Sequence, residues 1–565
     1  MARSRLFKNP LCWCLGMLSH DSHRDDHDSG DAKENGNKIT EKENDKSDKM
    51  AHRKSGPNVG FGERNPNLCR TCRKVDFNSL FRSHDCELFA IGSLDRFEGH
   101  RRFCRCRQEL ISCTNRLRSP QLAYKGLLGK LDSHAPACSF CAFLYQCQVR
   151  LNLIPAKEEQ WYCIIKPYVA ALQMCKVQRT RSGRMLETSP MPQPILRVAD
   201  SNSKTLTRNK EASGGFLGRK LDPNKVNLSL IGEWLTLCQS THSHCEDVDV
   251  GRVPGLLVID CITGYIIPVP FEQNTADQIA KYVTLSYLWG TAEATGRSAV
   301  QPINRDGWKG LALPTLVPLV ISDAIQVVKQ LGYRYLWVDR YCIPQDDRAA
   351  KHIQIRNMGR ISSNSSLTII SAAGDGPEYG LPGVSSRSRI EQVGVQINDK
   401  ISLVLYKPPT NHIANSKWNT RGWTYQEGLL SKRRLVFTDL MVYFQCQEMH
   451  GDEVLSLPIP ELGEHCDEIR PLLPEEIDIG MVFPKVTDWN NPVTIWKRIS
   501  DYGPRDLGYD SDALNVISGV MEICLRISDG CSHHLSHLKG IFLDLLDGYL
   551  RKRHLAMEIA PNFSF

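Results

Sequence analysis

The sequence predicts an α/β fold built on a central, mainly parallel sheet that is flanked by helices. Three apolar runs rich in β-branched and aromatic residues carry this prediction, and they cover 282–289, 335–338 and 367–371. The two stretches between them have the pattern of helices. Because strands and helices alternate, we expect the three strands to run parallel, with right-handed crossovers between them.

Each element of this core has a recognisable pattern. The run 282–289 is continuously β-rich up to Gly290, as is typical of a strand buried on both faces. Apolar residues from Ile321 to Leu331 recur at helical spacing, and Gly332 stands where a helix would end. A second helix is expected over 348–361. Further strand-like runs occur at 403–405, 435–437 and 441–444.

Composition divides the chain into five segments. We expect a disordered segment at 1–67, a cysteine-rich region at 68–176, a linker at 177–225, a core domain at 226–448 with its central motifs at 282–446, and a partly helical C-terminal extension at 449–565. The first segment is largely polar and charged, with too little apolar surface to offset the entropy of ordering. The linker is basic and has few apolar anchors. A helix is expected over 228–238 at the start of the core domain.

Charge and composition restrict the class of protein. With 41% apolar and 24% charged residues, the chain of 565 residues resembles an ordinary soluble globular protein. Its net charge of +7 is spread thinly and forms no basic stripe interleaved with aromatics, so we expect no nucleic-acid partner. The apolar runs 11–18 and 255–271 are too short or too interrupted to span a membrane. Twenty-one cysteines without a recognisable secretory leader favour reduced thiols in the cytoplasm, with the nucleus also open.

Polar residues follow two of the predicted strands, at the edge where parallel sheets bind ligands. These residues are Ser286, Trp289 and Gly290 after the first strand, and Asp339, Cys342, Gln345, Asp346 and Asp347 after the second. A structural alternative is favoured for any single residue. In that alternative the tryptophans pack in the core, Asp346 and Asp347 cap the next helix, and Cys342 is a small buried hydrophobe.

A third polar cluster spans 419–431 and includes Arg421, Gly422, Trp423, Gln426 and Glu427. The guanidinium of Arg421 could pair with an acidic strand-end residue or clamp a phosphate or carboxylate. Glu427 could act as a general acid or base only if it is buried beside the crevice. The candidate catalytic residues are therefore Glu427, Asp339 and Asp346, although pairing with arginine or exposure to solvent is favoured over catalysis.

Cysteine spacing suggests a structural metal in the cysteine-rich region. Cys69 and Cys72 form one pair with zinc-knuckle spacing, and Cys138 and Cys141 form another, with His134 nearby. The gap between the pairs is longer than in compact zinc ribbons, so zinc binding and simple packing both remain open. No other cofactor is expected.

A second set, Cys238, His242 and Cys245, would share one helical face if the helix at 228–238 continued. These residues could add metal ligands or merely pack. Packing is favoured, because Thr241 to His244 has the pattern of a helix end.

The three polar clusters together resemble the conserved blocks of the fungal heterokaryon incompatibility domain. The matching segments are Lys281-Tyr-Val-Thr-Leu-Ser-Tyr-Leu-Trp-Gly290, Tyr335-Leu-Trp-Val-Asp-Arg-Tyr-Cys-Ile-Pro-Gln-Asp-Asp347 and Asn419-Thr-Arg-Gly-Trp-Thr-Tyr-Gln-Glu-Gly-Leu-Leu-Ser431. The resemblance extends to the cysteine-bearing segments 69–77, 138–141 and 234–245, and to the later segments 501–505 and 509–519. Leu288, Pro344 and Gly428 depart from the residues usual in the family. In place of Gly428 the family usually has an arginine, which would offer an anion contact.

The resemblance implies non-self recognition between fungal cells and programmed cell death, a role comparable to innate immunity. It also implies a fold distantly similar to Toll/interleukin-1 receptor domains, which assemble as signalling scaffolds and in some cases cleave NAD. The favoured hypothesis is a binding and assembly module with protein partners or self-association. The alternative is a glycohydrolase acting on NAD, in which Arg421 holds the ligand's phosphate. A zinc-dependent DNA-binding regulator is disfavoured, since the sequence lacks a basic recognition helix.

Overall fold

The computed structural model describes about half of the chain. The described residues are 68–69, 72–74, 77, 137–150, 160–166, 171–179, 185–187, 194–198, 217–245, 252–271, 279–290, 300–305, 308–399, 401–456, 481–484, 497–498, 500–508, 512, 515–517 and 519–520. The expected disordered segment 1–67 and His134 lie outside them. Every described element belongs to the unit Gly56–Phe565.

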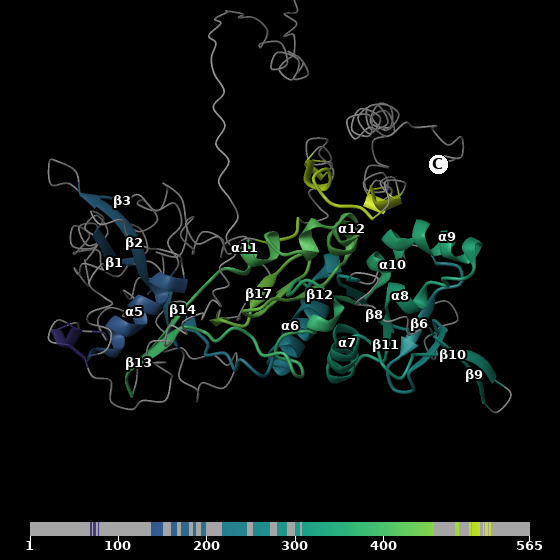
Figure 1. The fold of residues 1–565 in the computed structure, drawn as a ribbon, viewed down its shortest axis with the longest axis horizontal. Coiled ribbons are helices and arrows are strands. Elements are labelled where there is room, and N and C mark those ends of the chain that lie inside the picture. Colours follow the sequence, from purple (N-terminus) through teal and green to yellow (C-terminus); the bar gives the residue numbers. More distant parts are fainter. Residues whose placement is uncertain are drawn as a thin grey trace, which may run out of the picture. The chain divides into compact units, whose positions relative to one another are not determined.

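A ten-stranded sheet forms the centre of the fold (Figure 1). Its middle four strands run parallel in the order β15 (Arg434–Phe437), β12 (Leu367–Ser371), β8 (Tyr282–Ser286) and β11 (Tyr335–Trp337). Every residue of β8 and β12 is buried, as expected for strands covered on both faces. These elements confirm the predicted α/β class.

The sheet is mixed, so the expectation of a mainly parallel sheet is wrong. Three of its nine strand pairings are parallel. The flanking strands are β16 (Val442–Gln445) and β17 (His450–Asp452) on one side, and β6 (Leu257–Asp260), β7 (Tyr265–Pro268), β10 (Trp308–Ala312) and β9 (Gln301–Arg305) on the other. Short connections such as that between β6 and β7 make antiparallel hairpins, whereas the parallel strands are joined through longer crossovers.

Helices cover both faces of this sheet. Figure 1 shows α6 (Leu228–Thr241) and α7 (Leu319–Gln330) on one side, and α10 (Met358–Asn364) and α12 (Gly422–Leu430) on the other. The amphipathic α7 packs its apolar side on β8 and β11. The helix expected over 348–361 is two helices, α9 (Arg348–Arg356) and α10, because Asn357 ends the first and begins the second. The shorter helices are α8 (Asp339–Cys342) and α11 (Pro409–Ala414).

A second sheet of eight strands has the order β1-β2-β4-β14-β13 along its main path. Its strands are β1 (Gln160–Lys166), β2 (Ala171–Arg179), β3 (Met185–Glu187), β4 (Pro194–Val198), β5 (Leu217–Gly218), β13 (Gly394–Asn398), β14 (Ile401–Leu405) and β18 (Leu455–Ser456). The interpretation of 177–225 as a linker is therefore wrong where β3, β4 and β5 form. The strands β4 and β5 pair with β14 and β18, which are distant in sequence, so the local sequence of 177–225 does not reveal the pairing.

The cysteine-rich region contributes α5 (Ser139–Arg150) to the core of this second sheet. Phe140 and Phe143 of α5 are buried with Phe77 and with apolar residues of β13 and β14. The rings of Phe77 and Phe140 meet edge to face with centroids 5.0 Å apart. A short 3-10 helix, η2 (Cys72–Lys74), lies in the same cluster.

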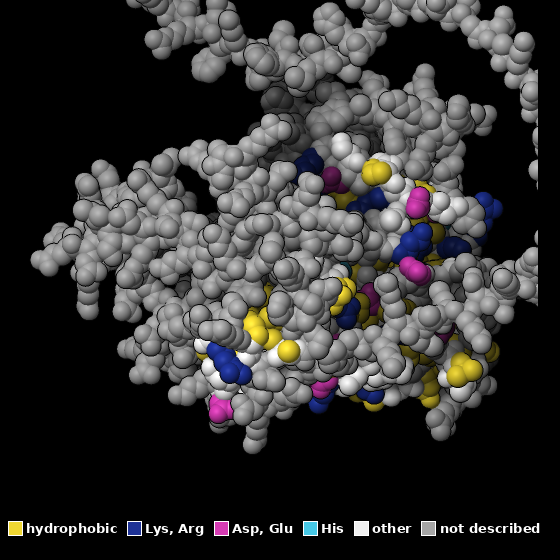
Figure 2. Space-filling model, turned by 60° about the vertical axis from the view of Figure 1, so that its left-hand side comes forward, with side chains coloured by type: hydrophobic (Ala, Val, Ile, Leu, Met, Phe, Trp, Pro, Cys, Tyr) yellow, Lys and Arg dark blue, Asp and Glu magenta, His cyan; other side chains and the backbone are white. Residues whose placement is uncertain are grey.

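Part of the C-terminal extension also packs on the fold. Tyr502 and the apolar residues Val516, Ile517 and Val520 are buried, and short helical pieces occur at 500–502 and 515–517. The rest of the predicted helical tail lies outside the described residues. No described helix has the length and apolar character needed to cross a membrane. On the face drawn in Figure 2, the described acidic and basic side chains are interspersed.

Candidate functional site

The three polar clusters meet at the carboxyl ends of β8 and β11. Ser286 is the last residue of β8, and Asp339 begins α8 directly after β11. Glu427 lies on α12, which packs against β8 and β12. The parallel alignment of the strands places their ends at one edge of the sheet, and α12 brings the third cluster to that edge.

Glu427 is buried and accepts a short hydrogen bond from the hydroxyl of Ser286. The indole Nε1 of Trp418, in the 3-10 helix η8 (Trp418–Thr420), donates to the same hydroxyl oxygen at 2.8 Å. Burial first and the negative charge of Asp339 second raise the pKa of Glu427 to about 7, against the opposing effects of the hydrogen bond from Ser286 and the charge of Arg421. A carboxyl with such a pKa exchanges its proton near neutral pH.

Asp339 is the second acid of the site and is half-buried. Its carboxylate accepts hydrogen bonds from Trp289 Nε1 at 2.6 Å and from the backbone N–H of Arg340 at 2.7 Å. Desolvation raises the pKa of Asp339, while the bond from Trp289 and the charge of Arg421 lower it. The Arg340 guanidinium stacks 5.3 Å over the Trp289 ring and donates to the Trp289 carbonyl at 3.1 Å.

Arg421 occupies the N-cap position of α12, and its charge acts on both acids. Its guanidinium donates to the carbonyl of Tyr287 at 3.1 Å, and its charge lowers the pKa of both Asp339 and Glu427. The structure thus brings together two hydrogen-bonded pairs, Ser286–Glu427 and Trp289–Asp339, with the charge of Arg421 acting on both acids. We call these five residues the strand-end cluster.

Three other motif residues on α12 serve packing and connection. Gly422 lies against Leu507, and its backbone N–H donates to the carbonyl of Asp506 at 2.7 Å. Trp423 Nε1 donates to Asp512 at 3.3 Å. Gln426 is buried and, in the amide orientation that satisfies both groups, bonds to the backbone of Gly359 and Val516 at 2.9 and 3.1 Å.

The remaining motif residues lie outside the strand-end cluster. Gln345 and Asp346 are exposed on the loop before α9. Asp347 caps α9 by accepting from Ala350 N at 3.0 Å, as the structural alternative proposed, whereas Asp346 does not provide the cap. Cys342 is buried, and desolvation raises the pKa of its thiol to about 12, which disfavours the thiolate needed by a nucleophile. Gly290 adopts a positive φ of 76°.

Sequence reasoning missed Trp418, Arg340 and Arg505 as members of the site's surroundings. Arg505 contacts the third cluster at Asn419. Its guanidinium donates to the backbone carbonyl of Asn419 and, at 2.8 Å, to the side-chain oxygen of the same residue. Trp418 directly precedes Asn419, so its place in the chain was a usable signal. No local pattern connected Arg505 with a segment more than eighty residues earlier.

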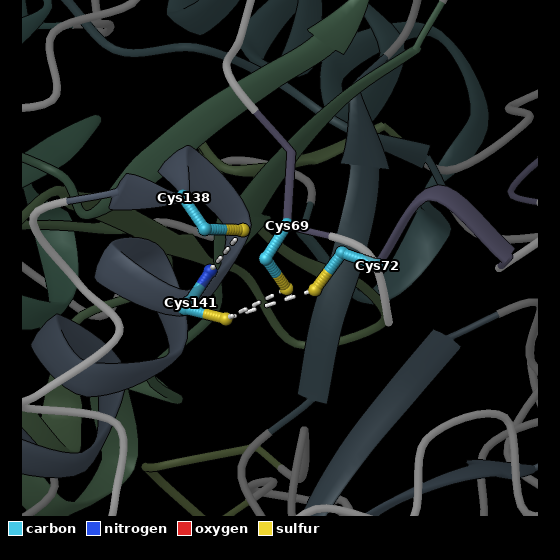
Figure 3. A group of neighbouring side chains, drawn as sticks. All are labelled: Cys69, Cys72, Cys138 and Cys141. Atoms are coloured by element: carbon cyan, nitrogen blue, oxygen red, sulfur yellow. Dashed lines mark hydrogen bonds between the residues drawn. The ribbon is translucent and has the colours of Figure 1, made fainter.

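The four cysteines predicted as metal ligands also converge (Figure 3). Cys69 and Cys72 come from the segment of η2, and Cys138 and Cys141 from the start of α5. The sulfur of Cys141 lies 3.6 Å from that of Cys72 and 4.0 Å from that of Cys69. A tetrahedral zinc with Zn–S bonds of about 2.3 Å places its sulfurs about 3.8 Å apart. The donor set and its geometry therefore fit a structural zinc.

Comparison with known proteins identifies the domain that contains the strand-end cluster. Residues 282–427 match the family model described as heterokaryon incompatibility protein (HET). This match, which runs from the start of β8 to Glu427, supports a heterokaryon incompatibility domain over these residues.

A curated relative supports the same family. The chain is 28% identical over 130 residues to "Heterokaryon incompatibility protein 6, OR allele" of Neurospora crassa. The match covers 21% of this chain and 18% of that protein. No solved structure matches the chain.

Proposed function

We propose that this protein acts in fungal non-self recognition and cell-death signalling, with its heterokaryon incompatibility domain as a binding and assembly module. The family of the domain and the name of its relative support this role. We expect it to act in the cytoplasm through protein partners or self-association.

The strand-end cluster is the observation that carries the assembly function. Its polar groups bond to one another across the three motifs: Ser286 to Glu427, and Trp289 to Asp339. The Ser286 hydroxyl also accepts from Trp418, so it donates to one partner while it accepts from another. Because these buried polar groups use one another as hydrogen-bond partners, they fix the relative positions of β8, α8 and α12. The motifs then support a rigid domain whose surface makes the contacts.

One observation favours a second candidate function, cleavage of NAD. Glu427 combines burial with a pKa near 7 and lies close enough to Asp339 for their charges to interact. Pairs of acids with raised pKa values are typical of catalytic sites, although structural networks produce them too. The charge of Arg421 acts on both acids, and its guanidinium could hold a phosphate.

Controlled expression in a fungal host distinguishes the two functions. Wild type, Glu427→Gln and Asp339→Asn are induced to equal protein levels, and viability and cellular NAD are followed together. We expect wild type to kill without loss of NAD, and Glu427→Gln to kill as well, because glutamine preserves the shape and can still bond to Ser286. Loss of NAD that precedes death and is abolished by Glu427→Gln would instead establish the enzyme. Leu316→Ala, a change of a side chain that is 79% exposed, is the control.

We also propose a structural zinc at Cys69, Cys72, Cys138 and Cys141. Four buried or partly buried protein ligands leave no open position on a tetrahedral ion, so its role would be to hold η2 against α5. Replacing Cys72 with serine in the full chain should remove one zinc ion per chain, measured by elemental analysis. Unchanged zinc content would contradict this site.

A further inference from the structure

A second group of cysteine and histidine side chains converges within the core of the ten-stranded sheet. Cys238 lies in the last turn of α6, His242 directly follows that helix, and Cys245 ends the 3-10 helix η6 (Ser243–Cys245). Cys446 directly follows β16. All four side chains are buried, and their ligand atoms lie within 4.8 Å of one another.

The geometry of this group suits a tetrahedral metal ion. The sulfur of Cys446 lies 3.3 Å from Nδ1 of His242. Zinc bonds of about 2.3 Å to sulfur and 2.0 Å to nitrogen place these two atoms about 3.5 Å apart in a tetrahedron. Three cysteines and one histidine form a common ligand set of structural zinc sites. The four side chains are thus already arranged as tetrahedral zinc coordination requires.

Hydrogen-bond donors and one cation lie against the sulfurs of this group, as is usual around the thiolate ligands of a metal. Backbone N–H groups of Glu448 and Met449 donate to the Cys446 sulfur at 3.4 and 3.2 Å. The buried guanidinium of Arg433 donates to the Cys238 sulfur at 3.2 Å and to the Cys245 carbonyl at 2.6 Å. A zinc ion with three thiolates and a neutral histidine carries one net negative charge, which the adjacent Arg433 balances.

We propose that Cys238, His242, Cys245 and Cys446 bind a second zinc ion, which fastens the end of α6 to the end of β16. On binding, the three thiols release three protons and the imidazole binds through a neutral ring nitrogen. Four buried protein ligands fill the tetrahedron, so the ion is structural rather than catalytic. The ring of Trp234 in α6 also stacks on the ring of Phe444 in β16, with centroids 5.9 Å apart, so a second contact joins these two elements.

This site replaces the packing interpretation of Cys238, His242 and Cys245. The helix does end at Thr241, as expected, but the extended backbone of His242 and the following 3-10 turn bring Cys245 back to the cluster. The fourth ligand, Cys446, is 204 residues from His242 along the chain. Zinc binding here is independent of the signalling function proposed above.

The test measures zinc per chain in the full-length protein, purified under reducing conditions without chelator. We expect two zinc ions in wild type, one in Cys446→Ser, one in Cys72→Ser and none in the double variant. Cys261→Ser, which changes a buried cysteine outside both clusters, should retain two. Wild-type zinc content in Cys446→Ser would overturn the proposal, as would a single zinc in wild type that Cys72→Ser removes.

A ligand-preserving variant guards against a simple loss of folding. Cys446→His keeps a zinc-binding side chain, so it should retain two ions, whereas Cys446→Ser should not. Cobalt substitution in the Cys72→Ser background then reports on this site alone. Sulfur-to-cobalt charge-transfer bands should appear in Cys72→Ser. They should be weaker in the double variant Cys72→Ser with Cys446→His, because one thiolate is lost. Absence of these bands in Cys72→Ser would contradict the assignment.

Discussion

Glu427 has an environment unlike that of an ordinary carboxylate in water. It is buried, Asp339 is near enough to repel its charge, and Ser286 is its hydrogen-bond donor. The desolvation and the repulsion outweigh the hydrogen bond, so the folded protein prefers the protonated acid. In an unfolded chain the same side chain would titrate near its ordinary value. Glu427 therefore links protein stability to pH.

The expected pH dependence follows from the raised pKa of Glu427. Below about pH 4.5 both folded and unfolded chains hold the proton, and the stabilisation from the protonated acid is fully present. As pH rises through about 7, the folded protein must ionise a buried group, and this stabilisation is lost. The loss is about 3 kcal/mol at most.

Denaturant unfolding of wild type and Glu427→Gln from pH 4.5 to 7.5 measures this effect. Wild type should lose stability relative to the variant as pH rises, because glutamine does not titrate. A stability difference that stays constant over this range would contradict a raised pKa for Glu427.

At the scale of secondary-structure elements, α12 is held between the sheet and a segment far along the chain. Residues 505–508 run beside its first turn, where Arg421 pairs with Asp506 as a β-bridge. The Arg505 guanidinium stacks 4.5 Å over the Tyr425 ring of α12. Gly422 allows this approach, since a Cβ there would meet the Leu507 side chain at 2.3 Å. The C-terminal segment thus helps to position the helix that carries Glu427.

Gly422→Ala should separate α12 from this segment. The added methyl group overlaps Leu507, and overpacking of this kind typically costs 1–3 kcal/mol, so about that loss of stability is expected. Thermal unfolding measures the loss, and limited proteolysis should cut within 501–508 faster than in wild type. Gly508→Ala is the control, because a Cβ at that position meets nothing within 4 Å. Equal stability of the two variants would show that Leu507 yields without cost.

At the scale of the whole molecule, the region that matches the family model is only part of a folding unit. Residues 282–427 contain β8, β11 and β12 but not β15, which pairs with β12, or β6, which pairs with β11. They also contain β14 without its partner β4. Both sheets therefore depend on strands outside the matched region.

A fragment of residues 282–427 should fail to unfold cooperatively, because it exposes unpaired edges of β11, β12 and β14. A fragment of residues 68–520, which contains every described element, should unfold cooperatively. Expression of both, followed by thermal unfolding monitored by circular dichroism, compares them. A cooperative transition in the shorter fragment would mean that the parallel strands and their helices are sufficient on their own.

The sequence by itself determined the parts of the fold that depend on local patterning. The continuous apolar runs of β8, β11 and β12 and the helical spacing of α7 predicted the parallel core. A strand buried on both faces leaves an unbroken apolar run, whereas a helix buried on one face leaves apolar residues at helical spacing. The same patterning predicted that Ser286 and Asp339 follow two strands at the ligand-binding edge of the sheet, whereas it left open whether Glu427 lies beside that edge.

Only the tertiary structure decided which partners these elements take. The strands β3, β4 and β5 are short and lie in a polar stretch of the sequence. They form strands because they pair with other segments, as β4 does with β14. Likewise, Cys446 joins Cys238 and His242, and Trp418 joins Ser286, through contacts between distant parts of the chain. The physical reason is that local periodicity records which face of an element is buried, whereas the identity of the partner is fixed only when the chain folds on itself.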